Sequence, residues 1–502
     1  LMTVGTTALA RLLDPTTPTT GLLSVVSRGT LTVTANPPLQ AGVILSGPTD
    51  YPYWPDDRDV RFENAGTINA IGTSAIYGWG AISNSGTIQV DQAIAIYSRK
   101  GDVINNGVIR QLAGGSGSRG IYASGHVVNS GTVDTDGTAI TLGDYLGSLD
   151  NSGLLRSATG PTIQGYSYAS IENRASGRIE SGTNGIAIDL SYGLGGSVTN
   201  AGTIVGDIIL AGQYYSGWSN SYVGSGTVDG DIMFGAGNDI FLQMRDDSGV
   251  TGRIDGGEGE DLYARIYQSD TTVGLGGRPD IGFELDYIGA AKGVTVTIAA
   301  DAISAEPTFV GGEGTVINLA TLDGIVTNDV PSYFYGAVVP ALPQIMDSFV
   351  NRGRLTGGAA LNANSIVNEG TIRVTNAGYG SSLGQYASHG AFSFTNVGRI
   401  LQSPYGNAVS LNGLGVSNFH VDNSGLIDGG MDITALLDAT ANGEVAIANS
   451  GTISAGQRSA LTIDNINFTT IASGRYSLSN SGLIEASALA DAAVHLSFDY
   501  VG

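Results

Sequence analysis

Residues 82–88 read Ile-Ser-Asn-Ser-Gly-Thr-Ile, and close copies of this short segment recur along most of the 502-residue chain. The shared pattern is Asn-x-Gly-x-(Ile/Val/Leu), and it begins at Asn64, Asn84, Asn105, Asn129, Asn151, Asn200, Asn351, Asn368, Asn396, Asn423, Asn449 and Asn480. A further copy, residues 173–179, carries two extra residues before its glycine. Within each of the two stretches rich in the motif, successive copies are 17 to 31 residues apart. Self-similarity at such a loose period is typical of a stacked array of repeats.

Each repeat also contains short runs in which apolar residues alternate with small or polar ones. Examples are residues 93–96, 127–129 and 185–188. This alternation predicts short strands, and the frequent glycines disfavour helices because each would cost a helix about 1 kcal/mol. Residues 435–441 are the best helix candidate, and a weak one. The pattern predicts an all-β parallel solenoid without substantial helices; roughly twenty coils about 4.8 Å apart would make it on the order of 100 Å long.

The Asn and Gly of the motif are predicted to form the corners between strands. Both residue types tolerate the left-handed backbone region, so two of them placed two residues apart allow a tight turn. With the coils in register, the Asn side chains are expected to form an amide ladder along the axis. The apolar residue two positions after the glycine is expected to point inward and stack on its equivalent in the next coil.

Charge and composition argue against several classes of partner. The chain has 22 basic and 45 acidic residues, a formal charge of −23, and its only lysines are Lys100 and Lys292, so we expect no binding to nucleic acid or anionic membranes. The absence of cysteine removes disulfides, zinc thiolates and thiol nucleophiles. No apolar run approaches the ~18 residues of a membrane-spanning helix. Because residues 1–13 lack the basic start of a signal peptide, we interpret the chain as mature.

The motif divides the chain into four sections. Residues 1–63 hold half of the 14 prolines and are predicted to be an N-terminal cap or arm, since proline cannot donate to a strand ladder. Residues 64–204 form a first regular array. Residues 205–350 are predicted to be an irregular, acidic part of the solenoid with longer loops, and residues 351–502 a second regular array.

Two glycine-rich segments in the acidic section suggest a cation site. Residues 235–241 and 257–263 resemble the calcium-binding nonapeptide of repeats-in-toxin proteins, although they lie 22 residues apart instead of nine. This spacing puts the two segments at equivalent corners of successive coils. The resemblance implies Ca²⁺ held by carboxylates of adjacent turns. The candidate ligands are Asn238, Asp239, Asp255 and Asp261. Ordinary Gly-Asp turns are the alternative interpretation.

Aromatic residues gather in a few places and suggest contact surfaces. Tyr77 and Trp79 form one group, and the predicted contact site for a ligand or partner is the group Tyr214, Tyr215, Trp218 and Tyr222. Flat rings on an elongated β-surface suit sugar faces or a partner subunit. Packing of loops onto the solenoid is the alternative interpretation.

Catalysis has little support in the sequence. Solenoid polysaccharide lyases and hydrolases need clustered carboxylates with Lys or Arg, and the only adjacent Asp pairs, 56–57 and 246–247, have the character of turns. His126 and the other histidines have no partners at motif spacing. Ser382 lies in a Gly-x-Ser-x-Gly string, but no helix pattern follows it. We therefore expect a protein that is not an enzyme, with a polysaccharide lyase or hydrolase as an alternative.

The Asn-Ser-Gly-Thr-Ile segments at Asn84 and Asn449, together with residues 230–239 and 252–257, resemble the passenger regions of autotransporters from Gram-negative bacteria. The resemblance implies a right-handed parallel β-helix exported to the outer cell surface, acting as an adhesin, a self-associating factor or a scaffold. Such passengers precede an amphipathic C-terminal barrel, and no such pattern precedes Gly502. Either that barrel was removed or the chain is a different secreted solenoid.

Two non-catalytic functions follow. The first is a surface contact module that binds other cells, cell-surface or matrix polymers, or copies of itself. The second is a subunit of an extracellular filament or surface layer. Because unprotected strand edges favour pairing with another chain, such a subunit would assemble through the solenoid ends or the N-terminal arm.

Overall fold

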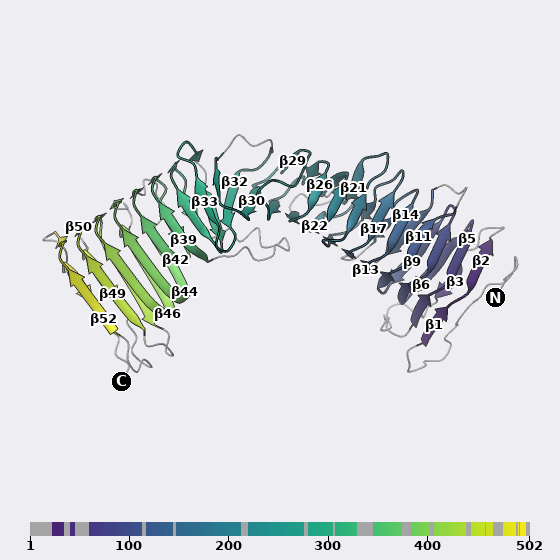
Figure 1. Cartoon of the computed structure of the whole chain (residues 1–502), viewed down its shortest axis with the longest axis horizontal. Helices are drawn as coiled ribbons and strands as arrows, with labels where there is room; N and C mark the ends of the chain where they lie inside the picture. Colours follow the sequence, from purple (N-terminus) through teal and green to yellow (C-terminus); the bar gives the residue numbers. More distant parts are fainter. Residues whose placement is uncertain are drawn as a thin grey trace.

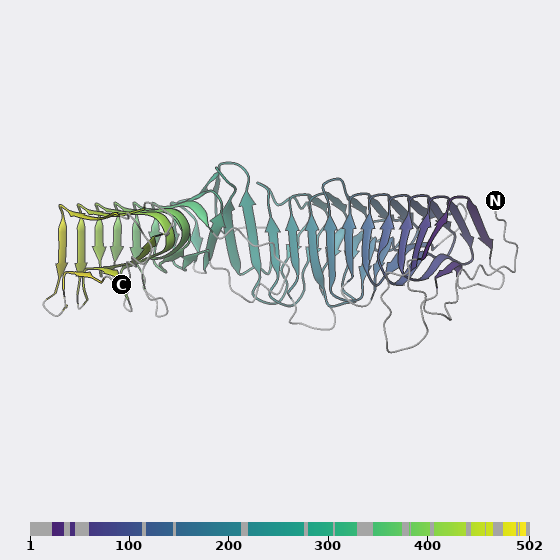
Figure 2. The same ribbon diagram turned by 90° about the horizontal axis from the view of Figure 1, so that it is seen from below.

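The described part of the chain is built from strands alone and contains no helix. The computed structural model describes residues 23–34, 41–45, 60–112, 117–143, 147–211, 219–275, 280–304, 307–328, 345–373, 381, 383–401, 406–437, 443–456, 458–464, 475–487, 490 and 492–497. These residues form a parallel β-solenoid that curves into an arch (Figure 1). Seen from below, the coils stack as successive rungs (Figure 2).

Each coil places its strands on three sides, which we call first, second and third in chain order. The first side is continuous from end to end, and its strands up to the second array are β1 (Leu23–Ser27), β4 (Val60–Asn64), β7 (Ala81–Asn84), β10 (Val103–Asn105), β13 (His126–Asn129), β16 (Ser148–Asn151), β19 (Ala169–Asn173), β22 (Gly196–Asn200), β25 (Ser221–Gly224), β28 (Ile240–Gln243), β30 (Leu262–Tyr267), β32 (Leu285–Ala290), β35 (Thr308–Gly312), β38 (Val326–Thr327) and β41 (Ala359–Leu361).

The other two sides of the first array are separate parallel sheets. The second side consists of β2 (Thr30–Thr34), β5 (Thr67–Ile71), β8 (Thr87–Val90), β11 (Val108–Gln111), β14 (Thr132–Thr135), β17 (Leu154–Ser157), β20 (Arg178–Glu180), β23 (Thr203–Val205) and β26 (Thr227–Asp229). The third side consists of β3 (Ala41–Leu45), β6 (Ser74–Trp79), β9 (Ile94–Lys100), β12 (Arg119–Ala123), β15 (Ile140–Leu142), β18 (Ile163–Gly165), β21 (Ile186–Asp189), β24 (Asp207–Ile209), β27 (Ile232–Met233) and β29 (Ile254–Asp255).

Further along the chain, two long bent strands, β44 (Leu383–Asn396) and β46 (Val409–Asn423), cover both the first and second sides. The first side ends with β48 (Met431–Leu437), β51 (Leu461–Asp464) and β54 (Val494–Leu496). The second side contains β31 (Thr271–Val273), β33 (Thr295–Ile298), β36 (Thr315–Asn318), β39 (Met346–Asn351), β42 (Ala363–Asn368), β49 (Glu444–Asn449) and β52 (Arg475–Asn480). The third side contains β34 (Ile303–Ser304), β37 (Thr321–Leu322), β40 (Arg354–Leu355), β43 (Thr371–Arg373), β45 (Arg399–Leu401), β47 (Leu426–Asp428), β50 (Thr452–Ala455) and β53 (Leu483–Ala486).

The predicted amide ladder is present in both arrays. In the first array, each buried Asn from Asn64 to Asn173 donates its Nδ2 to the Oδ1 of the next Asn, over 2.7–2.8 Å, and the row ends at Asn200. In the second array, an equivalent row runs from Asn318 to Asn480 over 2.6–2.9 Å. The apolar residue two positions after the motif glycine, such as Ile88 or Val133, is fully buried except in the last described copy, where Ile484 is partly buried. The repeat motif therefore supplies both the corner and the core of each coil.

The motif glycines are required for a different reason from the one predicted. Gly86 and its equivalents do not adopt the left-handed conformation. A Cβ on Gly86 would lie 2.0 Å from the carbonyl oxygen of Gly66 in the preceding coil. Successive corners stack so closely that the backbone of one coil occupies the space that a side chain of the next would need. The helix candidate at residues 435–441 is also wrong for its described residues, because Ala435 belongs to β48 and pairs in parallel with Gly413.

The two ladders lie at different corners of the coil. Parallel pairing connects the first-side strands without a break from β22 through β25, β28, β30, β32, β35 and β38 to β41. In the first array the ladder residue closes a first-side strand, as Asn200 closes β22. In the second array Asn368 closes β42, which follows β41 on the second side. The ladder has therefore moved by one side of the coil between the two arrays.

The N-terminal section contributes a regular coil. In the predicted cap or arm, β1, β2 and β3 pair in parallel with β4, β5 and β6 of the following coil. The first coil thus has the same three-sided arrangement as the coils after it. Pro37 and Pro38, in the chain between β2 and β3, lie outside the described residues.

Candidate functional site

Two glycine-rich segments were predicted to form a cation site. They stack on one another in successive coils, as their spacing indicated. Ala236 and Glu258 form a parallel bridge between them. Gly235, Gly237, Gly257 and Gly259 all have positive φ values, between 98° and 147°. A Cβ on Gly257 would lie 1.8 Å from the carbonyl oxygen of Gly235, so only glycine fits there. In these corners glycine is needed both for the positive φ value and for the close approach of the backbone of the preceding coil.

Asp239 and Asp261 follow the two corners, and their carboxylates connect successive coils. Asp239 Oδ1 accepts a hydrogen bond from the Asn220 amide over 2.5 Å, and Asp261 Oδ1 accepts one from the Asp239 amide over 2.7 Å. Glu284 Oε2 accepts from the Asp261 amide over 2.9 Å. Each acidic side chain thus holds the backbone of the coil before it. We call Asp239, Asp261 and Glu284 the carboxylate stack.

Burial makes the two aspartates of this stack unusually weak acids. Desolvation raises the pKa of Asp239 to about 7, with a further contribution from the Asp261 charge and an opposing one from the Asn220 amide. Desolvation likewise raises the pKa of Asp261 to about 7, and the charges of Glu284 and Asp255 add to the effect. Both side chains are fully buried, and the Oδ2 atom of each has no hydrogen-bond partner. Buried unpaired carboxylates are costly unless a proton or a cation neutralises them.

The four predicted calcium ligands do not gather around one point. Asn238 Oδ1 accepts a hydrogen bond from the Glu260 amide over 3.1 Å, and Asp255 lies 3.4 Å from Arg253 in an ion pair. Carboxylate oxygens are the donors that Ca²⁺ prefers, and Asp239 and Asp261 supply two of them. Within the part of the chain that the structure describes, no three His, Cys, Asp or Glu side chains form a group suited to a metal ion.

The predicted aromatic contact site is only partly described. Tyr214, Tyr215 and Trp218 lie outside the described residues. Tyr222 is fully buried, and its hydroxyl oxygen accepts a hydrogen bond from Asn200 Nδ2 over 3.2 Å. Burial raises its pKa to about 12. Tyr222 therefore terminates the first amide ladder and is not part of a contact surface.

A stripe of neutral side chains runs along the outer face of the third side. It was not predicted as a site from the sequence. Strand register aligns Tyr77, Tyr97, Tyr122, Thr141 and Gln164 on successive coils. The first three rings are partly exposed and stacked, with centroids 4.9 and 4.5 Å apart and interplanar angles of 19° and 3°. Stacked rings cover the faces of one another and leave mainly ring edges accessible.

Two exposed tyrosines end this stripe. Tyr166 and Tyr192 are 44% and 50% exposed, and their ring centroids lie 6.3 Å apart at 48°. The Tyr166 hydroxyl donates to Gln164 Oε1 over 3.2 Å. The signal in the sequence is a tyrosine three or four residues after the third-side apolar residues Ile163 and Ile188. We call Tyr77, Tyr97, Tyr122, Thr141, Gln164, Tyr166 and Tyr192 the tyrosine stripe.

One histidine has a partner that spacing along the sequence did not indicate. His126 Nδ1 lies 2.7 Å from Ser148 Oγ, which follows it on the first side of the next coil. Asp102 Oδ1 accepts from the backbone amide of His126 over 3.4 Å and not from its ring. A hydrolytic triad needs the carboxylate on the imidazole and an oxyanion hole, whereas the backbone amides here are committed to parallel sheet. Ser382 lies outside the described residues.

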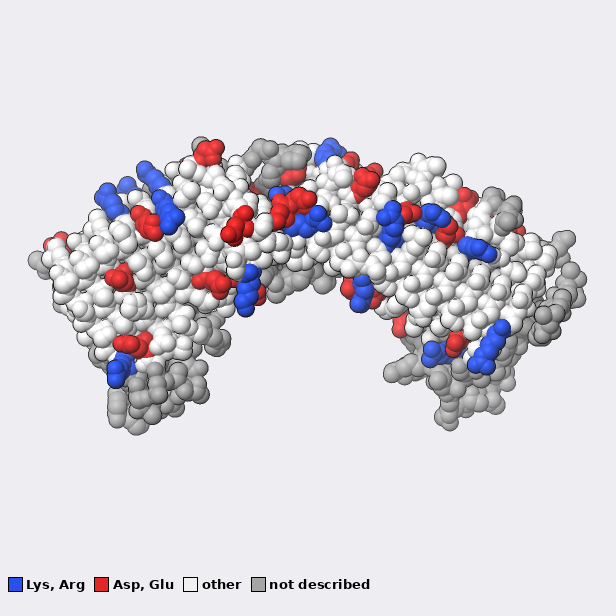
Figure 3. Space-filling model, viewed as in Figure 1, with Lys and Arg blue, Asp and Glu red and all other residues white. Residues whose placement is uncertain are grey.

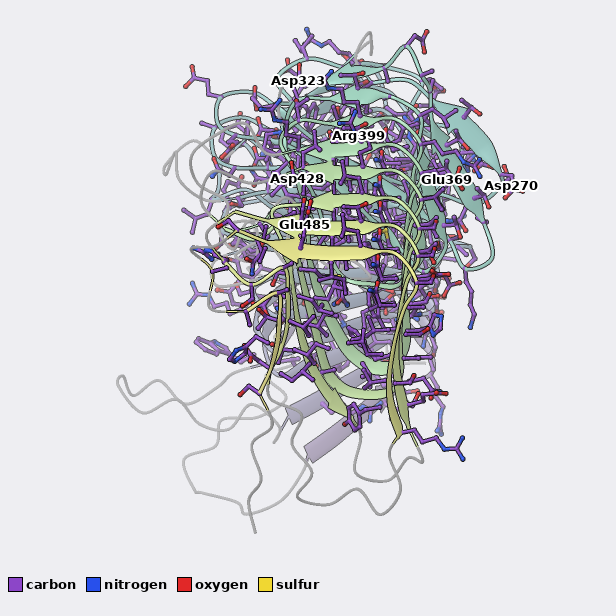
Figure 4. All side chains as sticks on the ribbon, turned by 90° about the vertical axis from the view of Figure 1, so that its left-hand side faces the viewer. Asp270, Asp323, Glu369, Arg399, Asp428 and Glu485 are labelled. Atoms are coloured by element: carbon purple, nitrogen blue, oxygen red, sulfur yellow. The ribbon has the colours of Figure 1, made fainter. Side chains whose placement is uncertain are left out.

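Some charges on the surface form local pairs of opposite sign. Arg156 contacts Asp134 at 2.5 Å, Arg174 contacts Asp150 at 2.5 Å, and Arg352 contacts Glu369 at 2.9 Å. Figure 3 shows red and blue side chains interspersed over a mainly uncharged face. Figure 4 shows Asp323, Arg399 and Asp428 over the third-side strands of the second array. Exposed pairs of this kind contribute at most about 1 kcal/mol each, so they affect solubility more than stability.

Comparisons with protein-family models, with curated proteins and with solved structures found no match. Among the described residues there is no helix with the length and apolar character needed to cross a membrane.

Proposed function

We propose that this chain is an exported contact module of the outer surface of a Gram-negative bacterium, a non-catalytic solenoid that adheres to other cells, to cell-surface or matrix polymers, or to copies of itself. The observation that carries the proposal is the tyrosine stripe. It is a row of neutral side chains along the third side of the first array, all partly or strongly exposed except the buried Thr141. Aromatic side chains with an apolar body and a polar tip are enriched at interfaces.

The proposal includes a right-handed solenoid of roughly twenty coils, of the kind found in autotransporter passengers. Right-handed winding is supported by the strong preference of parallel strands for right-handed crossovers. The coil number is supported by the parallel pairings that run from β1 to β54. The resemblance of the Asn-Ser-Gly-Thr-Ile segments to autotransporter passengers supports export and display at the cell surface.

We also propose that the chain is not an enzyme, and the positions of its chemically reactive side chains support this. The chemically notable side chains lie on flat sheet faces, as His126 and Ser148 do, or are buried, as Asp239 and Asp261 are. Catalysis requires groups held within reach of a substrate in a site that excludes water. Neither the His126–Ser148 pair nor the carboxylate stack provides that arrangement.

A bead assay tests the contact function. Beads coated with the purified chain should adhere to bacterial cells or aggregate with one another, whereas beads coated with an unrelated acidic solenoid should stay dispersed. Coated beads that remain dispersed and bind no cells would contradict the proposal. Release of reducing sugar from a panel of polysaccharides would instead favour the lyase or hydrolase alternative.

The alternative proposal is a subunit of an extracellular filament or surface layer that assembles through the solenoid ends or the N-terminal arm. Unprotected strand edges favour pairing with another chain. Negative-stain micrographs separate the two candidates, since filaments or sheets indicate polymerisation and single rods indicate a monomeric module.

A further inference from the structure

The end of the tyrosine stripe combines two exposed aromatic rings with neutral hydrogen-bonding groups. Tyr166 and Tyr192 are the aromatic residues among the strongly exposed large side chains of the described ranges, and they are neighbours on successive coils. Exposing one large ring is common, but two adjacent exposed rings form a patch that suits a ligand. Their 48° tilt leaves ring faces accessible, in contrast to the stacked rings of Tyr97 and Tyr122.

The polar groups beside these rings are uncharged and suited to hydroxyl groups. The Gln164 amide offers N–H donors, and its Oε1 already accepts from the Tyr166 hydroxyl. The buried Thr141 and the partly exposed Tyr122 lie in the same row on the preceding coils. Asp189, the next residue in this row, is buried and its Oδ1 accepts from the amide and hydroxyl of Ser191. Its carboxylate is therefore committed within the protein.

These features favour a neutral glycan over other partners. A sugar ring has a face of C–H groups, which packs on an aromatic face, and a rim of hydroxyl groups, which pair with amides and tyrosine hydroxyls. The centroid spacing of 4.5 to 4.9 Å along the stacked rings follows the separation of parallel strands, so the row presents side chains at regular intervals to an extended chain. An anionic polysaccharide would meet a protein of formal charge −23. Arg99, which lies 5.8 Å from the Tyr77 ring, is at the other end of the row.

We propose that the tyrosine stripe binds a neutral glycan chain along the solenoid axis, with Tyr166 and Tyr192 packing on its sugar faces and Gln164 bonding its hydroxyl groups. This inference rests on the proposed contact function and names the ligand class and the site. The partly exposed edges of the stacked Tyr77, Tyr97 and Tyr122 extend the contact.

Affinity electrophoresis tests the proposal. The purified chain is run through native gels containing either neutral polysaccharides, namely hydroxyethyl cellulose, galactomannan and a soluble β-1,3-glucan, or the acidic polygalacturonate. We expect retardation by at least one neutral polymer. Tyr166→Ala combined with Tyr192→Ala should weaken the retardation about tenfold, since each aromatic contact contributes about 0.5–1.5 kcal/mol. Tyr166→Phe with Tyr192→Phe keeps the rings and should retain most of the binding.

The matched control is Val397→Ala, which truncates an exposed side chain at a corner of the second array and should leave retardation unchanged. Circular dichroism and melting curves check that the double alanine variant remains folded. Retardation by no neutral polymer, retardation by polygalacturonate alone, or equal retardation of the double alanine variant would overturn the glycan site. Self-association that the double variant abolishes, without glycan binding, would also overturn it and assign the stripe to contacts between copies. Adhesion in the bead assay without glycan retardation would leave the contact function standing, so the two failures are distinguishable.

Discussion

The regular arrays and the central section connect successive coils through different side chains. In the arrays, each buried Asn both accepts from the coil before it and donates to the coil after it. In the central section, Asp239 and Asp261 accept from the preceding backbone but leave their Oδ2 atoms unpaired. An amide can extend a row indefinitely because it has both a donor and an acceptor, whereas a carboxylate is only an acceptor. The central section is therefore the place where the stack depends on solution conditions.

The largest effect is expected from Gly86→Ala. The new Cβ would meet the Gly66 carbonyl oxygen at 2.0 Å, so the two coils must separate, and we expect a loss of about 4 kcal/mol from the free energy of unfolding of the first array. Urea denaturation measures the loss. Gly29→Ala is the matched control, because Gly29 occupies the equivalent corner of the first described coil and a Cβ there meets nothing within 4 Å. Equal destabilisation by both substitutions would show that close stacking does not select glycine.

Asn129→Asp should have the next largest effect. It replaces the donor to Asn151 Oδ1 with an acceptor inside a fully buried row, at a cost of about 3 kcal/mol. Asn106→Asp is the control, since Asn106 is exposed on the neighbouring coil and accepts only from the Ser130 hydroxyl among the described contacts. Hydrogen exchange should show faster exchange confined to coils near residue 129. If the two variants were equally stable, the ladder would not contribute to stability.

The carboxylate stack predicts that the central section loses stability as pH rises. Asp239 and Asp261 have pKa values raised to about 7 in the folded chain, against about 4 when unfolded. The protonated forms therefore favour folding, and the stabilisation is complete below pH 4 and lost as pH rises towards 7 and above. We expect a loss of about 2–4 kcal/mol from this section, seen as smaller protection factors at residues 220–285 at pH 8 than at pH 5 after the intrinsic rise of exchange rate with pH is divided out. Asp239→Asn with Asp261→Asn should remove this dependence.

Calcium is the other species we propose as a means of neutralising this pair. If Ca²⁺ binds Asp239 and Asp261, its addition at pH 8 should raise the melting temperature and slow the same exchange, and a chelator should reverse both changes. At pH 5, where protons compete, the effect should be much smaller. Melting curves at pH 8 that do not move on adding Ca²⁺ or a chelator would leave protonation as the means of neutralisation.

The smallest effect is expected from Tyr222→Phe at the end of the first ladder. The substitution removes the acceptor for Asn200 Nδ2, which keeps a second bond of 3.2 Å to the Thr227 carbonyl, so the cost should be about 1 kcal/mol. Tyr192→Phe, at an exposed position, should change stability by less than about 0.5 kcal/mol. If Tyr222→Phe left the free energy of unfolding unchanged, the ladder would need no terminating group.

The coil, its strands and the Asn ladder could be predicted from sequence because they repeat. Every copy of Asn-x-Gly predicts the same corner, so each further copy strengthens the prediction made at Asn84 and Asn449. Asn318 joins the second ladder without the motif glycine, since Ala320 occupies that position, and the pattern therefore missed it. The true reason for the glycines was also missed, because a contact between corners 20 residues apart is a property of stacking and not of local conformation.

The candidate sites were harder to predict because the outward-facing side chains do not follow the repeat pattern that the core and ladder residues follow. The stacking of Asp239 on Asp261 followed from their spacing, but their burial and unpaired oxygens did not. Tyr222 belonged to an aromatic cluster in the sequence, yet Gly224 beside it makes room for the ring inside the coil, where a Cβ would lie 2.6 Å from that ring. Tyr166 and Tyr192 are 26 residues apart in sequence, and only the strand register makes them neighbours.

The direction of the sheet hydrogen bonds has a mechanical consequence. Because these bonds run along the axis from one coil to the next, a force that pulls the two ends apart opens them one coil at a time instead of shearing many together. A coil such as that from Asn129 to Asn151 contains 22 residues, so its release would lengthen the chain by about 70 Å. A rod built in this way would extend in steps under load and absorb tension between the surfaces that it joins.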